Sequence, residues 1–279
     1  MNKNNFVMDD VIRTNDDAAE CRWSAIKAGL LDDSIGELKI LEELLNRPPR
    51  SKQPIINRGT FIRTKWIDTQ LEKLLLEDEM EVVILGAGFD LRAMRLDLKN
   101  VIEVDLDAVI DTKKRVLPSY PADLIGGDLS DESFLERIVK NSSARKCIIL
   151  AECLFPYLER ICIERIIRKY KENRTEVHVL LFEPIVARNV DTFGSLMLQN
   201  VPARMPGVFV SASESESFYI SLGFKAISKV NMNEAITDLS KEDQERLRLR
   251  GCLDEYEEWS LMSSHYYLFH YYFSVEQSQ

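Results

Sequence analysis

The sequence predicts an α/β fold in which a doubly wound, mostly parallel sheet of seven strands is covered by helices. The first observation is a series of short, nearly continuously apolar runs that begins near Glu81 and reads as buried parallel strands. These runs lie at 82–86, 101–105, 122–128, 147–153 and 177–183. The second observation is the helical spacing of apolar residues between them, at 107–115, 131–141 and 159–171. Repeated βα units of this kind build a doubly wound sheet.

The end of the chain has a different pattern, which is the third observation. Residues 223–230 and 264–273 are expected to form two further strands, and the last, which is rich in aromatic residues, is expected to be antiparallel. A helical insertion at about 186–200 is expected before them. We expect one domain over 1–279, with its core in 81–279.

Residues 1–80 are expected to form an N-terminal helical cap. Asp16 and Asp17 precede a helical stretch that ends at Lys27, and 35–45 places its leucines on one stripe. Residues 61–77 form another amphipathic pattern. The Pro-bearing, basic segment 46–59 between these two patterns is expected to be an ordered crossing loop.

Composition excludes several classes of protein. The 279 residues include 45% hydrophobic and 29% charged residues, which is ordinary globular usage. The formal net charge of −10 argues against extensive nucleic-acid binding, although a local basic patch stays open. Five cysteines without paired spacing indicate reduced thiols, not a disulfide framework or a metal site. Without a leader-like or membrane-spanning apolar run, a cytoplasmic location is expected.

The turn after the first predicted strand is the first candidate for a binding site. In VILGAGFDLR, Gly86 and Gly88 let a ligand approach the backbone, but Leu91 replaces the third glycine of the dinucleotide fingerprint. An adenosine ligand without a pyrophosphate therefore fits better. Asp105, at the end of the second strand, could accept both hydroxyls of a ribose. The alternative is a tight turn followed by an exposed acid.

Acids also follow the third and fourth predicted strands. Asp128 could recognise an adenine or cap the next helix, and the two roles can coexist. Glu152 follows a buried strand and needs a partner or water. Since open α/β sheets bind ligands at the carboxyl ends of their strands, these acids and the glycine turn are expected at one edge.

An ordered series of motifs covers nearly the whole chain. It comprises INRGTFIRT, VILGAGFD, EVDLD, GGDLSD, AECLFPYL, DTFG and LDEYEEWSLMSSHYYL. Together they resemble the leucine carboxyl methyltransferase family. This resemblance implies a Rossmann-like class I methyltransferase fold with extra N-terminal helices and S-adenosylmethionine as cofactor.

The resemblance also implies cofactor contacts at particular positions of this chain. They fall on Arg22, Arg63, Gly86, Asp105, Asp128, Leu129 and Glu152. Arg22 stands where related sequences have a lysine, which keeps a cation but changes its geometry. Ile84 stands where the wider methyltransferase pattern has a polar or acidic residue, which removes one cofactor hydrogen bond.

The chemistry implied is in-line attack of a carboxylate on a methyl sulfonium, which needs no general base because the carboxylate is ionised near pH 7. Positioning must therefore supply the catalysis. Arg63 and the Tyr157 hydroxyl are the candidates for orienting the acceptor, and Arg58 is a second cation to consider. In isolation, Arg63 could merely form an ion pair, and Tyr157 could be a packed rim aromatic.

The leading hypothesis is esterification of a protein C-terminal leucine, which the resemblance identifies with the catalytic subunit of a type 2A protein phosphatase. The basic residues of 47–65 could form a cationic entrance for its acidic tail or only a solvated loop. One alternative is the carboxyl methyltransferase of the transfer RNA wybutosine pathway, towards which the ending DEYEEWSLMSSHYYL leans. Another is a catalytically silent binding protein with this fold.

Overall fold

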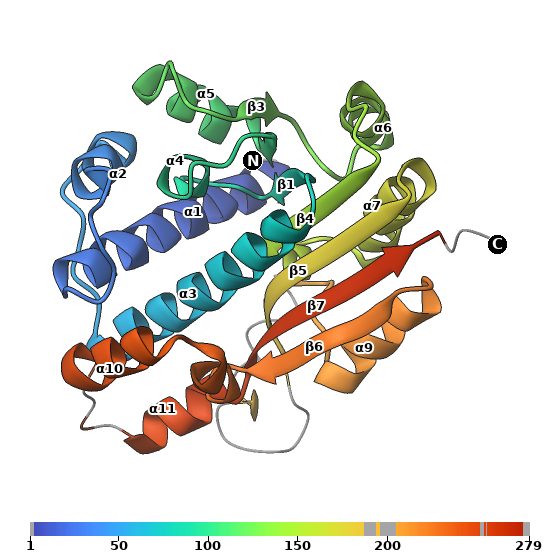
Figure 1. Cartoon of the computed structure of the whole chain (residues 1–279). Coiled ribbons are helices and arrows are strands. Elements are labelled where there is room, and N and C mark those ends of the chain that lie inside the picture. The colour runs from blue at the N-terminus through green and yellow to red at the C-terminus, as the bar shows by residue number, and fades with distance from the viewer. Residues whose placement is uncertain (1–2, 187–193, 196–204, 252–253, 255, 276–279) are drawn as a thin grey trace.

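The structure is a computed structural model that describes residues 3–186, 194–195, 205–251, 254 and 256–275. Its centre is a seven-stranded sheet with the order β3-β2-β1-β4-β5-β7-β6 (Figure 1). The strands are β1 Glu81–Leu85, β2 Val101–Asp105, β3 Asp123–Gly126, β4 Lys146–Glu152, β5 Glu176–Pro184, β6 Lys225–Asn231 and β7 Tyr266–Ser274. Each predicted strand is confirmed, with ends that differ by no more than two residues.

Strand direction follows the prediction as well. The pairs formed among β1 to β5 are parallel, whereas β7 runs antiparallel to both β5 and β6. The order reverses at β1, which has β2 on one side and β4 on the other. The carboxyl ends of β1, β2 and β4 therefore lie around one topological switch point, where open α/β sheets bind ligands.

Helices cover both faces of this sheet. They are α1 Lys3–Lys27, α2 Glu37–Leu45, α3 Pro54–Glu77, α4 Arg92–Arg95, α5 Asp107–Val116, α6 Glu132–Asn141, α7 Arg160–Asn173, α9 Ala212–Ser221, α10 Lys241–Arg250 and α11 Tyr256–Ser263. Short 3₁₀ turns lie at Phe155–Tyr157 and Glu234–Asp238. Figure 1 shows α1 and α3 crossing one face of the sheet, with α6, α7 and α9 on the other.

The alternation of side chains along β1 separates two cores. Val82 and Ile84 point into a cluster with the apolar residues of α1 and α3, while Val83 and Leu85 join those of α6 and α7. All five residues of β1 are buried, as expected of a central parallel strand. The N-terminal helices therefore complete the core on one face and lie over the carboxyl edge of the sheet.

Two details of the N-terminal segment differ from the prediction. The first helix begins at Lys3, well before Asp16. The segment 46–59 is a loop only as far as Gln53, because α3 begins at Pro54 and runs without interruption to Glu77. The predicted helical insertion at 186–200 lies almost entirely outside the described residues.

Candidate active site

A cavity of about 690 Å³ opens at the switch point, between the sheet edge and helices α1 and α3. This volume lies within the usual range for small-molecule sites. All eight residues predicted to bind the cofactor or act in catalysis line it: Arg22, Arg63, Gly86, Asp105, Asp128, Leu129, Glu152 and Tyr157. The structure thus brings these eight residues together around one space.

The glycine turn forms the floor of the cavity. Gly86 and Gly88 have φ values of 63° and 51°, which favour glycine. A Cβ on Gly86 would lie 2.9 Å from Leu154 Cδ1. The Asp105 carboxylate accepts hydrogen bonds from the backbone N–H groups of Gly88 and Leu106, both at 2.7 Å. Because a carboxylate accepts about four hydrogen bonds, it keeps capacity for two ribose hydroxyls.

Burial shapes the protonation of this acid. Desolvation raises the pKa of Asp105 above its ordinary value, and the backbone hydrogen bonds from Gly88 and Leu106 oppose that rise. The two backbone donors therefore favour the ionised form of Asp105, against the effect of burial.

At the opposite end of the cavity, Glu152 lies between two arginines. Its Oε1 accepts a hydrogen bond of 2.9 Å from Arg92 Nη2, and its Oε2 lies 3.0 Å from Arg63 Nε. The Arg63 guanidinium also packs over the Phe182 ring, 5.2 Å from its centroid. Glu152 thus has the charged partners that a strand-end acid at this depth requires.

Arg22 is held by a different acid. Its Nε and Nη2 donate to the two oxygens of Glu37, both at 2.8 Å, and Nη1 donates to Thr64 Oγ1 at 3.4 Å. Glu37 is buried with 2% exposure, so this bidentate pair fixes the guanidinium on the cavity wall. A lysine could not make the same forked contact.

The remaining predicted residues lie along the rim. Asp128 accepts from the Ser130 backbone N–H at 2.8 Å. The N-cap of α6 is Asp131, which accepts from two backbone N–H groups, so helix capping does not explain Asp128. Leu129 is buried beside it, and Tyr157 ends the 3₁₀ turn that follows β4.

Most basic residues of 47–65 do not form the cationic entrance that was considered. Arg47 and Lys52 pair with acids of α1, Glu20 among them, and Lys65 lies 3.0 Å from Asp243. Arg58, the second orienting candidate, does not line the cavity. It donates to the Gly251 carbonyl at 2.9 Å and lies over the Trp259 ring.

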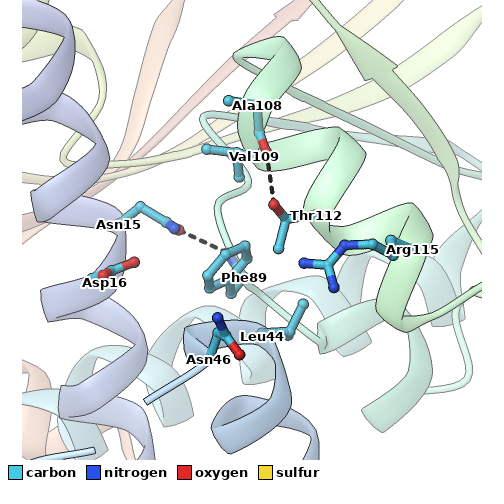
Figure 2. A pocket seen from close by; sticks show the side chains of 9 residues that line it. All are labelled: Asn15, Asp16, Leu44, Asn46, Phe89, Ala108, Val109, Thr112 and Arg115. Atoms are coloured by element: carbon cyan, nitrogen blue, oxygen red, sulfur yellow. Dashed lines mark hydrogen bonds between the residues drawn. The ribbon is translucent and has the colours of Figure 1, made fainter.

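A smaller cavity of about 290 Å³ adjoins the first and shares Asn15, Phe89 and Val109 with it. Figure 2 shows Asn15 of α1 facing the Phe89 backbone, where Asn15 Oδ1 accepts a hydrogen bond of 3.0 Å. The Asn15 Nδ2 atom is buried without a hydrogen-bond partner in the described part of the chain. Helix α1 is therefore fastened to the loop after the glycine turn and leaves a donor at the cavity.

Sequence reasoning missed three residues around this site, namely Glu37, Asp68 and Arg92. Arg92 contacts Asp68 on α3 as well as Glu152 on β4, which are 24 and 60 positions away. The only local signal was the charged FDLR immediately after the glycine turn. Glu37 had only its place at the start of an amphipathic helix.

The comparisons with known proteins agree with this geometry. The model of the leucine carboxyl methyltransferase family matches residues 11–171, which is more than half of the chain. The chain belongs to the leucine carboxyl methyltransferase family. That match contains the glycine turn, the strand-end acids, Arg22, Arg63 and Tyr157.

Full-length relatives have the same family name. The chain is 27% identical to leucine carboxyl methyltransferase 1 of Schizosaccharomyces pombe, with 93% of each chain covered. It is 28% identical to a probable leucine carboxyl methyltransferase 1 of Caenorhabditis briggsae, with 95% of this chain and 92% of that one covered. A putative methyltransferase structure from Thermobifida fusca shares the fold, with a TM-score of 0.57, 11% identity, and 91% and 94% coverage.

Family membership makes this chain an S-adenosylmethionine-dependent methyltransferase. The cavity fits that cofactor in its donor set, because Arg63 and Glu152 offer a cation and an anion to the zwitterionic amino-acid end. The glycine cradle, in which a Cβ would strike Leu154, leaves room for the nucleoside beside Asp105. Among the described residues, no helix combines the length and apolar character needed to cross a membrane.

Proposed function

We propose that this methyltransferase esterifies the C-terminal leucine carboxylate of a protein, and that the protein is the catalytic subunit of a type 2A protein phosphatase. The observation that carries the proposal is the convergence of Arg63, Arg22 and Tyr157 on one cavity that also holds the nucleoside-type residues. The names of the curated relatives support a leucine carboxylate as acceptor.

The cofactor is proposed to lie along the sheet edge. Asp105 accepts the ribose hydroxyls, Asp128 and Leu129 contact the adenine, and the amino-acid end lies between Arg63 and Glu152. Gly86 allows the ligand to approach the floor of the cavity. The distribution of charge supports this direction, since the paired arginine and glutamate are at one end and Asp105 is at the other.

When bound, S-adenosylmethionine supplies a methyl group on a sulfonium: the acceptor oxygen forms the new C–O bond as the C–S bond breaks. The protein does not transfer a proton, because a C-terminal carboxylate is ionised near pH 7. Arg63 orients the methyl donor through its carboxylate end, and the Tyr157 hydroxyl donates to the acceptor carboxylate. Glu37 neutralises part of the charge of Arg22 on the cavity wall, so the attacking oxygen keeps its nucleophilicity.

The test is a methyl-transfer assay with methyl-labelled S-adenosylmethionine and the phosphatase catalytic subunit, beside a subunit that lacks its final leucine. We expect base-labile methyl ester on the intact subunit alone. Tyr157→Phe retains the ring and removes the hydroxyl, so we expect it to lower the rate about 10-fold to 100-fold while cofactor binding is retained.

Other outcomes would redirect the assignment. Cofactor binding without label on either subunit would contradict the proposal, and transfer RNA would then be the acceptor to test. A protein that binds no S-adenosylmethionine would be the silent relative. The paired state of Arg47, Lys52 and Lys65 favours the protein acceptor, because these three cations already contact acids and are not available to a polyanion.

A further inference from the structure

Glu152 has two cationic partners of different kinds. Arg92 is 3% exposed and donates to Oε1, whereas the Arg63 side chain is 21% exposed and lines the cavity beside Oε2. Within the part of the chain that the structure describes, the buried Nε of Arg63 makes no hydrogen bond of good geometry, although it lies 3.0 Å from the carboxylate. Both arginines line the cavity, but Arg92 is almost fully buried, whereas Arg63 is more open to the space that a ligand would fill.

Arg92 is fixed by three carboxylates at once. Its Nε donates to Asp68 Oδ1 at 2.8 Å, Nη1 contacts Asp90, and Nη2 donates to Glu152. Neighbouring Arg92 and Arg95 hold the pKa of Asp68 at about 2, so this acid stays ionised at neutral pH. A planar guanidinium with its donors used in this way has no freedom to follow a ligand.

The loop between the glycine turn and Arg92 is fixed by contacts to the Asp90 carbonyl. The Asp90 carbonyl is contacted by Lys113 Nζ and lies 3.1 Å from the Tyr120 hydroxyl. Lys113 and Glu103 form an ion pair with 0% exposure of both side chains. Arg92 is thus anchored to the same loop that forms the cofactor floor.

We propose that Arg92 is a positioning residue that holds Glu152 in place for the amino group of the cofactor, while Arg63 exchanges Glu152 for the carboxylate of the cofactor. This inference rests on the proposed placement of the amino-acid end between Arg63 and Glu152. Without a ligand, Arg63 and Glu152 form an ion pair with each other. When the cofactor binds, its carboxylate pairs with Arg63 and its amino group pairs with Glu152. Glu152 then still has Arg92 behind it, so it does not rotate or follow Arg63.

The test compares two probes in calorimetric titrations. S-adenosylhomocysteine has the amino-acid end, and 5′-methylthioadenosine has the same nucleoside without it. We expect Arg92→Gln to weaken S-adenosylhomocysteine about tenfold, since a charge-assisted hydrogen bond that orders Glu152 is lost, and to leave 5′-methylthioadenosine within about twofold. Arg92→Lys retains the charge but not the fork, so an intermediate effect is expected.

Arg95→Gln is the matched control. Arg95 also pairs with Asp68, lines the same cavity and is 12% exposed, but within the described residues no hydrogen bond or ion pair joins it to Glu152. We expect this variant to keep the wild-type ratio of the two dissociation constants. When Glu152 is already replaced by Gln, adding Arg92→Gln should not change the ratio of the two dissociation constants further, because the carboxylate that Arg92 positions is absent.

Each result separates the possibilities. Equal weakening of both probes by Arg92→Gln would mean that Arg92 only supports the fold, and would overturn the inference, as would an unchanged ratio. If Arg92→Gln does not fold, the ratio measured with Arg92→Lys decides the question in the same way. If the wild-type protein does not distinguish the two probes, the proposed placement of the amino-acid end is wrong, which is a different failure.

Discussion

The Nδ1 of His178 lies 2.8 Å from the Nε2 of His270, across the buried boundary between β5 and β7. His178 Nε2 lies 3.2 Å from Glu176 Oε1 on the same strand. If His178 Nε2–H faces this carboxylate, its Nδ1 accepts from His270 Nε2–H, and both rings are neutral. Burial lowers the pKa of both histidines, and for His270 burial, together with the facing His178, lowers the pKa to about 4.

This pair predicts loss of stability in acid. Above about pH 6.5, His270 is neutral in both states, whereas between pH 6.5 and 4 only the unfolded chain takes up the proton. As the pH is lowered from about 6.5 to 4, the contribution of this group to the free energy of unfolding should therefore decrease by up to about 3 kcal/mol. Urea unfolding at several pH values should show a shallower decline for His270→Phe than for the wild type. Parallel profiles would contradict the assigned protonation.

A second prediction concerns the floor of the cavity. Gly86→Ala puts a side chain at a φ of 63° and presses a Cβ against Leu154, so we expect cofactor binding to weaken about tenfold or more. Gly36→Ala is the control, because its φ is 70° but no atom lies within 4 Å of the new Cβ. Both variants should lose about 1–2 kcal/mol of stability, and only Gly86→Ala should lose binding. Equal binding by the two would show that the cradle does not contact the ligand.

A third prediction follows from Asp105. Asp105→Asn keeps one acceptor oxygen and turns an amide donor towards the N–H groups of Gly88 and Leu106, so both the turn and the ribose contact should suffer. We expect about 10-fold to 100-fold weaker binding of both S-adenosylhomocysteine and 5′-methylthioadenosine, since both have the ribose. Selective loss of only one probe would place the ribose elsewhere. Asp105→Asn should thus weaken both probes equally, whereas Arg92→Gln is expected to weaken only S-adenosylhomocysteine.

The sheet could be predicted because each strand is a short apolar run, and a parallel order follows from the βα alternation. The start of α3 could not, since the proline and glycine of QPIINRG indicate a loop. In the structure, Pro54 occupies the first helical position, where its missing N–H costs nothing. Position 59 lies inside the helix, and a glycine suits it because a Cβ there would lie 3.1 Å from Met232 Cε. That contact joins residues far apart in the sequence.

The same distinction applies to the candidate site. Gly86, Asp105, Asp128 and Glu152 could be expected at one place because each follows a strand, and the topology gathers strand ends. The partner of Arg22 could not be expected, because Glu37 reaches it across the packing of α1 and α2. The sequence therefore predicts which residues lie at the ends of strands, whereas it does not predict ion pairs between helices, because these depend on tertiary packing.

A final prediction concerns Glu183, a buried acid that the proposed reaction does not use. Its side chain is 1% exposed, and Oε1 has no hydrogen-bond partner among the described residues. Burial raises its pKa to about 8, so the folded protein holds a neutral acid at pH 7. Between about pH 4.5 and 8 only the unfolded chain releases this proton, and the stability should therefore decrease as the pH rises, by up to about 5 kcal/mol.

Glu183→Gln removes this titration while keeping the size and polarity of the side chain. We expect the variant to match the wild type in urea unfolding near pH 4.5 and to become more stable than it by several kcal/mol at pH 8. The sign is opposite to that of His270, so in the wild type the two groups oppose each other between pH 4.5 and 6.5. A constant difference between Glu183→Gln and the wild type across this range would mean that Glu183 is ionised in the folded protein.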